Sequence, residues 1–226
     1  MIRIAVLASG GGTNLQALLD ACASRRIDGE VAVVLSNVPG AGALERARRA
    51  GAATEVVPSK GALDRAVYDA ALVERLRPYS PDLVCLAGYM RLLTPTFLRA
   101  FGPAPSTHGC PRVMNIHPAL LPSFPGLHAQ RQCLAYGARF AGCTVHFVDE
   151  GTDTGPIIAQ AVVPVLPEDD EAALTARVLA EEHRIYPQAV GWFAAGRLAL
   201  DGRRVVVRGA RTPLPFALRS PSDEES

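Results

Sequence analysis

The sequence lacks the features of a disulfide framework, a zinc site or a membrane span. Its five cysteines are scattered, without a C-x-x-C pair and without a histidine at ligand spacing, which favours a reducing compartment. The apolar run within Met1–Ala8 is too short for a signal peptide, and no segment approaches the roughly 18 apolar residues of a membrane span. We therefore expect a cytoplasmic protein with no metal ion and no contact with a membrane.

An excess of charge of one sign is also missing. The chain has 23 Lys and Arg against 22 Asp and Glu, a formal charge of +1. Basic residues such as Arg46, Arg48 and Arg49 are interleaved with acids and alanines, as on a solvated helix face, so no nucleic-acid partner is indicated. With 226 residues, 49% of them hydrophobic, the chain is long enough for one domain with a substantial core.

Short apolar runs alternate with helical patterns in the first half of the chain. Runs rich in branched residues predict parallel strands covered on both faces at Arg3–Ala8, Val31–Ser36 and Asp82–Gly88. Apolar residues three and four apart predict helices at Asn14–Cys22, Ala43–Ala50 and Ala62–Leu76. This alternation predicts an α/β fold, a doubly wound, mostly parallel open sheet with helices on both faces.

The second half is less regular. We expect a central strand at Val113–Ile116 and a hairpin-like pair of strands at Cys143–Val148 and Ile157–Val165. A long helix is predicted over Glu168–Ala195, with a kink or break at Pro187. The remaining expectations are an edge strand at Arg203–Val207, a single domain over residues 1–210 and a flexible tail over 211–226.

The segment Ser9–Asn14, "SGGGTN", follows the first predicted strand and opens the first predicted helix. Free backbone N–H groups and the positive end of a helix converge there, which suits a phosphate. The alternative is a glycine-rich turn that only permits a tight connection. A dinucleotide is disfavoured, because Leu15 would occupy the last glycine position of the G-x-G-x-x-G pattern.

Asn115 and His117 stand at the carboxyl end of a predicted central strand, within "NIHPALLPSFPGLH". Ligands of open α/β sheets bind at that edge, and residues two apart in a strand point to the same face. An amide N–H beside an imidazole suits the stabilisation of an oxyanion in acyl transfer. The alternative is a pair of strand-end residues that make only local hydrogen bonds.

The loop Asp149–Pro156, "DEGTDTGP", carries three carboxylates in a turn-rich stretch. Such loops are usually just solvated, but Asp153 precedes a Thr-Gly-Pro bend that could aim it at the sheet edge. A carboxylate beside His117 would favour the imidazolium, a cationic acid and hydrogen-bond donor.

The other histidines are more typical of structural roles. His146 lies within an alternating strand, His183 in the long helix and His108 in a turn-rich loop. His128 follows the Pro-Gly turn, and its role stays open.

In this order and spacing the segments resemble the phosphoribosylglycinamide formyltransferases of purine synthesis. The likeness spans roughly residues 1 to 200 and includes "RIAVLASGGGTNLQALLDA", "DLVCLAGYMRLLTPTFL", "NIHPALLPSFPGLHAQRQ", "GCTVHFVDEGTDTGPIIAQ" and "EEHRIYP". The resemblance implies a Rossmann-like formyltransferase fold and two small-molecule substrates, glycinamide ribonucleotide and the formyl donor 10-formyltetrahydrofolate. It also implies a monomer or weak homodimer with no metal.

The resemblance assigns roles to individual positions. Gly12, Thr13 and Asn14 would hold the substrate's 5′-phosphate, and Glu182 would contact its ribose. The catalytic residues would be Asn115, His117 and Asp153. The folate site would be formed by Arg65, Met90, Arg91, Leu92, Leu93, Asn115, Val148, Asp149 and Asp153.

Two departures from the family pattern stand out. The connection Gly102–Pro111 is longer than usual, and Leu179 occupies a position where relatives often have a polar or basic residue near the phosphate. Loss of such a contact would weaken substrate binding by about 1 kcal/mol at an exposed site.

Three rival functions remain at this stage. A formyltetrahydrofolate hydrolase would use the same catalytic residues on water, but is expected to carry a further N-terminal domain. A methionyl-tRNA formyltransferase is expected to need a C-terminal RNA-binding domain. A non-catalytic nucleotide-binding module would need no histidine and carboxylate across the cleft.

Overall fold

The computed structural model describes residues 1–59, 61 and 64–210. Its main sheet has seven strands in the order β3-β2-β1-β4-β5-β6-β7. Strands β1 to β5 pair in parallel, whereas β6 and β7 are antiparallel to their neighbours. The strands are β1 (Ile2–Ala8), β2 (Gly29–Ser36), β3 (Ala53–Val56), β4 (Leu83–Leu86), β5 (Val113–His117), β6 (Phe140–Phe147) and β7 (Ile157–Pro164).

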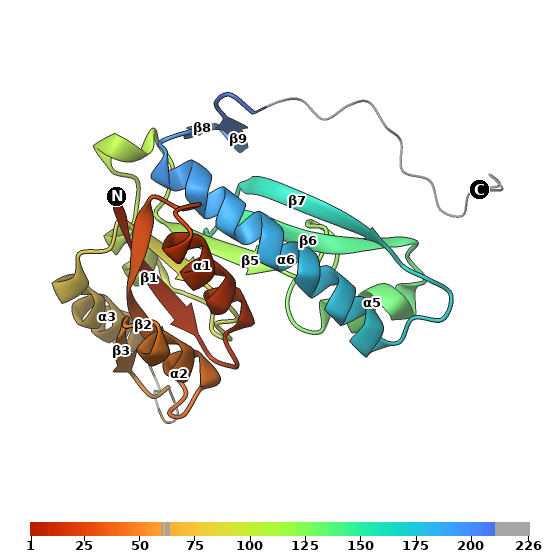
Figure 1. Cartoon of the computed structure of the whole chain (residues 1–226), viewed down its shortest axis with the longest axis horizontal. Coiled ribbons are helices and arrows are strands. Elements are labelled where there is room, and N and C mark those ends of the chain that lie inside the picture. The colour runs from red at the N-terminus through yellow and green to blue at the C-terminus, as the bar shows by residue number, and fades with distance from the viewer. Residues whose placement is uncertain (60, 62–63, 211–226) are drawn as a thin grey trace.

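Helices cover both faces of the sheet (Figure 1). They are α1 (Thr13–Ala23), α2 (Gly42–Arg49), α3 (Arg65–Leu76), α4 (Pro95–Ala100), α5 (Ala129–Tyr136) and α6 (Glu171–Ala194). Alternate residues of β1 enter two different cores: Ile4 and Val6 pack with α1 and α6, whereas Ala5 and Leu7 pack with α3 and α4. The predicted doubly wound, mostly parallel sheet is confirmed.

Most predicted elements lie where the sequence placed them, including the central strand β5 and the β6–β7 hairpin. The prediction missed β3, α4 and α5, which are short, and placed the start of β6 three residues late, at Cys143. The helix predicted over Ala62–Leu76 is α3, which begins at Arg65; Ala62 and Leu63 lie outside the described residues. The Asp64 carboxylate accepts hydrogen bonds from the backbone N–H groups of Ala66 and Val67 and so caps a helix that starts at Arg65.

Of the kink or break predicted at Pro187, the break is wrong, because α6 is continuous from Glu171 to Ala194. The kink stays a prediction. A proline inside a helix removes one backbone hydrogen bond. Here the turns on both sides of it are anchored in the core by the buried side chains of Ile185, Tyr186, Ala189 and Val190. The helix starts at Glu171 rather than Glu168, because the Asp170 side chain caps it through the Ala173 N–H.

A strand is present where one was predicted at Arg203–Val207, and β8 (Leu198–Asp201), which was not predicted, is its partner. Strand β9 (Arg204–Val207) pairs with β8 in a separate antiparallel ribbon and does not join the main sheet. The predicted tail, 211–226, lies outside the described residues. Within the described part of the chain, no helix combines the length and apolar character needed to cross a membrane.

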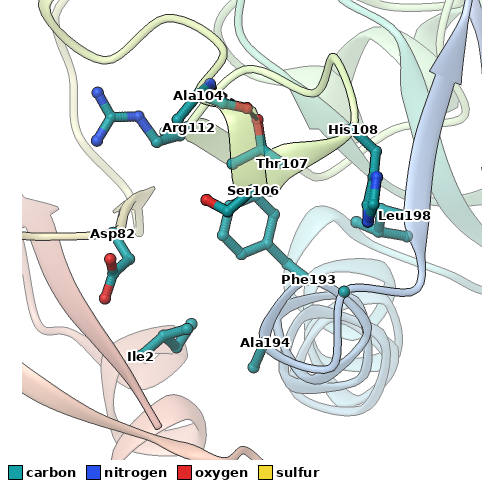
Figure 2. A pocket seen from close by; sticks show the side chains of 11 residues that line it. Ile2, Asp82, Ala104, Ser106, Thr107, His108, Arg112, Phe193, Ala194 and Leu198 are labelled. Carbon is teal, nitrogen blue, oxygen red and sulfur yellow. Dashed lines mark hydrogen bonds between the residues drawn. The ribbon is translucent and has the colours of Figure 1, made fainter.

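The extended connection Gly102–Pro111 packs at the amino-terminal edge of the sheet. It contains the 3-10 turn η2 (Pro105–Thr107) and forms one wall of a cavity of about 200 Å³ against the start of β1, the end of α6 and β8. Figure 2 shows Ser106 and Thr107 of this connection near the ring of Phe193. Asn115 and His117 lie near the opposite ends of the strands, so this connection lines the cavity and is remote from the candidate catalytic edge.

A buried tyrosine of α6 links β4 and β5. The Tyr186 hydroxyl lies 2.9 Å from the Leu86 carbonyl oxygen and 3.1 Å from the Met114 carbonyl oxygen. Its side chain is fully buried. Since Met114 directly precedes Asn115, this hydroxyl fixes the strand ends from which the candidate catalytic side chains project.

We predict that Tyr186→Phe lowers the free energy of unfolding by about 1–3 kcal/mol, because buried carbonyls lose their donor without a change in packing. Tyr136→Phe is the matched control: its side chain is 82% exposed, and we expect a change within about 0.5 kcal/mol. Urea unfolding of both variants measures the difference. Equal stability of the two variants would show that the Tyr186 hydroxyl does not hold the strands.

Candidate active site

The candidate catalytic side chains gather on one face of the sheet near the end of β5. Val113 belongs to the core under α3 and α4, so Asn115 and His117, two and four residues further on, project from the same face. In the antiparallel register of β5 and β6, Asn115 lies directly opposite His146. The loop between β6 and β7 brings Asp153 to this group.

Asn115 and His146 form a hydrogen-bonded pair. The Nδ2 atom of Asn115 lies 3.1 Å from Nε2 of His146, and Nδ1 of His146 lies 2.8 Å from the Phe147 carbonyl oxygen. Since a carbonyl only accepts, Nδ1 carries the proton and Nε2 accepts from the amide. Burial lowers the pKa of His146, and this outweighs the attraction of Asp153. His146 is therefore neutral near pH 7 and orients the Asn115 amide.

His117 has an acceptor at each ring nitrogen. Its Nε2 lies 2.9 Å from the Phe124 carbonyl oxygen, and its Nδ1 lies 3.3 Å from Oδ2 of Asp153. The side chain is 6% exposed. Because neither a carbonyl nor an ionised carboxylate can donate, the imidazolium is the form that satisfies both contacts.

Asp153 holds the group together. Its backbone has φ 55°, in the left-handed region that residues other than glycine seldom adopt. Its Oδ2 also accepts a 2.8 Å hydrogen bond from the Gly126 N–H, and its Oδ1 lies 3.7 Å from Nε2 of His146. Asp149 fixes the same loop from inside, since it accepts hydrogen bonds from the Gly151 N–H and the Thr154 hydroxyl.

The glycine loop lies between β1 and α1. Gly12 precedes the helix with φ 76°, and the first helical residue is Thr13. The first turn contains no acidic side chain, so its free N–H groups and the helix dipole favour an anion. This arrangement agrees with the phosphate site predicted at Gly12, Thr13 and Asn14.

Asn14 and Glu182 meet across the interface of α1 and α6. Nδ2 of Asn14 donates a 2.6 Å hydrogen bond to Oε2 of Glu182. Glu182 is 7% exposed, and burial raises the pKa of its carboxyl, opposed by this hydrogen bond. Oδ1 of Asn14 is buried without a hydrogen-bond partner among the described residues. The Glu182 carboxyl and the Asn14 Oδ1 atom therefore place acceptor oxygens next to the first turn of α1.

The predicted folate wall largely comes together in one cavity. A hollow of about 80 Å³ is lined by Arg91, Leu92 and Leu93 from one predicted wall and by Val148, Asp149 and Asp153 from the other. Asn115 and His146 complete the lining between them. The Met90 and Leu92 side chains are exposed although apolar, by 62% and 53%. Met90 is not part of the lining, but its N–H donates to the Ser9 hydroxyl.

Arg65 lies outside that hollow. It lines a neighbouring open groove of about 810 Å³, and its Nη2 donates a 3.0 Å hydrogen bond to the Leu92 carbonyl. Arg91 stacks on the Tyr68 ring at 4.4 Å, and its Nε is buried without a partner among the described residues. Two arginines thus hold the segment Met90–Leu93 in place: Arg65 binds the Leu92 carbonyl, and Arg91 packs on Tyr68.

The sequence interpretation missed one residue of this site, His146, which was expected to be structural. The available signal was the hairpin: once β6 is paired antiparallel to β5 with its start near Phe140, His146 faces Asn115. In the described ranges, no group of three His, Cys, Asp or Glu side chains is arranged to hold a metal ion.

We predict that Glu182→Gln stabilises the fold at neutral pH. Burial raises the folded-state pKa of Glu182 above its unfolded value, so the wild type loses stability as pH rises through the folded pKa. A glutamine side chain at this position does not titrate and still accepts from Asn14. The gain in Tm should be largest at pH 7–8 and fade towards pH 4. Glu181→Gln, which removes only a pair with Arg184, should show no such gain; a gain of equal size would contradict the assignment.

Comparison with known proteins identifies the family of this chain. A family model described as formyl transferase matches residues 2–190. Phosphoribosylglycinamide formyltransferase of Escherichia coli is 45% identical over 94% of this chain and 96% of its own length. A crystal structure of glycinamide ribonucleotide transformylase 1 from Symbiobacterium toebii is 57% identical, with a TM-score of 0.86 over 92% of this chain and 94% of that one.

A longer relative matches as well. The trifunctional purine biosynthetic protein adenosine-3 of Drosophila melanogaster is 48% identical over 86% of this chain, which corresponds to 14% of the relative. The resemblance inferred from sequence motifs is therefore confirmed by whole-chain similarity and by structure. The chain belongs to the formyl transferase family.

Proposed function

We propose that this chain transfers the formyl group of 10-formyltetrahydrofolate to the amine of N1-(5-phosphoribosyl)glycinamide, giving the N2-formyl product and tetrahydrofolate. The observation that carries the proposal is the meeting of Asn115, His117 and Asp153 beside a cavity lined by both predicted folate walls. The close relatives with the name phosphoribosylglycinamide formyltransferase support the same reaction.

The ribonucleotide would bind along α1. Its phosphate is expected at the free N–H groups of Gly12, Thr13 and Asn14, where the helix dipole favours negative charge. Its ribose hydroxyl groups would donate to Glu182 and to the unpartnered Oδ1 of Asn14. This contact would also compensate a polar atom that is otherwise buried without a partner.

The formyl donor would bind on the other side of the catalytic group. Its pterin would lie between the segment Met90–Leu93 and the loop Val148–Asp153, with apolar contact from Leu92, Leu93 and Val148. Arg65, at the rim, is placed for the acidic tail of the folate. The donor is consumed in the reaction, and the proposal requires no metal.

The chemistry follows from the hydrogen-bond pattern. The amine attacks the formyl carbon, and the resulting oxyanion needs donors. Asn115 uses one N–H on His146 and can offer the other, while the formyl oxygen competes with the Phe124 carbonyl for Nε2–H of His117. Asp153 holds the imidazolium at Nδ1. The bond to N10 then breaks, and a proton passes from the amine to N10 through water.

The proposal predicts that tetrahydrofolate appears only when both substrates are present. Formate release from 10-formyltetrahydrofolate without the ribonucleotide would instead indicate a hydrolase.

Asp153→Asn should lower kcat about a hundredfold or more, because it removes the charge that pairs with His117 but keeps the shape. Steady-state kinetics at saturating substrates measure this. Glu150→Gln, in the same loop and exposed, is the control and should keep kcat within about twofold. Wild-type turnover in the Asp153 variant would refute its catalytic role.

His146→Phe should lower kcat about tenfold or more with little change in either KM, because Asn115 loses the acceptor that orients its amide. His146→Gln can still accept from Asn115 and should recover part of the loss. Thermal unfolding of both variants separates orientation from stability. If the Phe and Gln variants have the same kcat, His146 does not act through its acceptor nitrogen.

A further inference from the structure

We propose that Arg46, on α2, is a positioning residue that presets the backbone N–H groups of the glycine loop for the substrate phosphate. This inference rests on the function proposed above for that loop. Arg46 is expected to act through the loop backbone and through its charge, not through the reacting atoms.

Two successive carbonyls of the loop are held by α2. The Ala43 N–H donates a 3.0 Å hydrogen bond to the Gly10 carbonyl, and Nε of Arg46 donates a 2.8 Å hydrogen bond to the Gly11 carbonyl. In a trans peptide the C=O and the following N–H point in opposite directions, and the glycine peptides are trans. The N–H groups of Gly11 and Gly12 therefore point away from α2.

Those N–H groups remain available. In the part of the chain that the structure describes, neither Gly11 N–H nor Gly12 N–H donates a hydrogen bond. Gly11 is exposed and Gly12 half-buried, so both N–H groups are open to an anion that arrives from solution. An anion in front of Thr13 would meet them together with the first N–H groups of α1.

Helix α2 and the loop are packed backbone against backbone. A Cβ atom at Gly12 would lie 2.7 Å from Cα of Ala43, and one at Gly42 would lie 3.2 Å from Cα of Gly11. No side chain separates the two segments, so the position of α2 directly sets the position of the loop backbone.

Arg46 is itself held in place. Its Nη1 lies 3.2 Å from Oε1 of Gln16, and Nε2 of Gln16 donates a 2.9 Å hydrogen bond to Asp20. A fork of donors on a planar guanidinium can meet the loop carbonyl and the Gln16 amide at the same time. Lysine keeps the charge and has three N–H donors on one nitrogen, but it lacks the planar fork that reaches both acceptors from separate nitrogens.

Arg46 makes no direct ion pair. Among the described residues, no carboxylate lies within ion-pair distance of its guanidinium. It lines a cavity of about 310 Å³ together with Thr13, His183, Arg26 and Asp20, and the Asp20 carboxylate is linked to Arg46 only through Gln16. Burial and the nearby Arg46 lower the pKa of His183, so Arg46 rather than His183 carries positive charge near pH 7. Leu179 contributes no charge to this region.

Removal of Arg46 should free the Gly11 carbonyl and let the Gly11–Gly12 peptide rotate. The phosphate is bound equally in the ground state and the transition state, because it is remote from the formyl carbon. Such uniform binding affects KM and leaves kcat unchanged. Loss of a residue needed only for folding would instead change kcat and the KM values of both substrates together.

The test compares Arg46→Met and Arg46→Lys with Arg49→Met by steady-state kinetics in both substrates and by thermal unfolding. Arg49 lies on the same helix and pairs only with Glu45, so its variant should match the wild type. Arg46→Met should raise KM for glycinamide ribonucleotide about tenfold or more, with KM for the formyl donor and kcat within about twofold. Arg46→Lys should fall between.

The outcomes separate this inference from the proposed function. Absence of ribonucleotide-dependent transfer in the wild type would refute the function before any variant is made. With an active wild type, an unchanged ribonucleotide KM in Arg46→Met would overturn the positioning role. Parallel losses in kcat, both KM values and Tm would overturn it as well, since they indicate a general structural role.

Discussion

The carboxylate of Asp153 is the contact on which the catalytic arrangement depends. It joins three segments that are distant in sequence: the end of β5 through His117, the turn at Gly126 and strand β6 through His146. Its own backbone is held at φ 55°, a conformation that persists only when surrounding contacts fix it. His117 and His146 are both nearly fully buried, so one carboxylate lies beside two imidazoles that have different hydrogen-bond partners.

The parts of the fold that follow from local chemistry could be predicted from the sequence. The runs at β1, β2 and β4 are continuous and branched because they are covered on both faces, and this pattern is visible in the letters alone. The phosphate loop, Asn115 and His117 could be named as candidates because each lies where a parallel strand ends or a helix begins. Asp153 could be named because a Thr-Gly-Pro bend follows it. Their assignment to a reaction came from the family resemblance.

What escaped prediction depends on tertiary contacts. Pro187 has the local signature of a helix break, but buried neighbours on both sides keep α6 continuous. Strand β8 was not predicted, so the sequence did not show which strand β9 pairs with. His146 was assigned a structural role because alternation along β6 says nothing about its partner. The β5–β6 register, a non-local property, places it against Asn115.

The central claim is that the phosphate loop binds the phosphate of the ribonucleotide, while Asn115, His117 and Asp153 surround its amine and the formyl group that it attacks. A crystal structure with glycinamide ribonucleotide and an unreactive 10-formyl folate analogue tests it most directly. The account predicts the phosphate on the N–H groups of Gly12–Asn14, the pterin between Met90–Leu93 and Val148–Asp153, and the amine facing the analogue's carbonyl beside Asn115. A phosphate bound elsewhere, or an amine remote from Asn115 and His117, would contradict it.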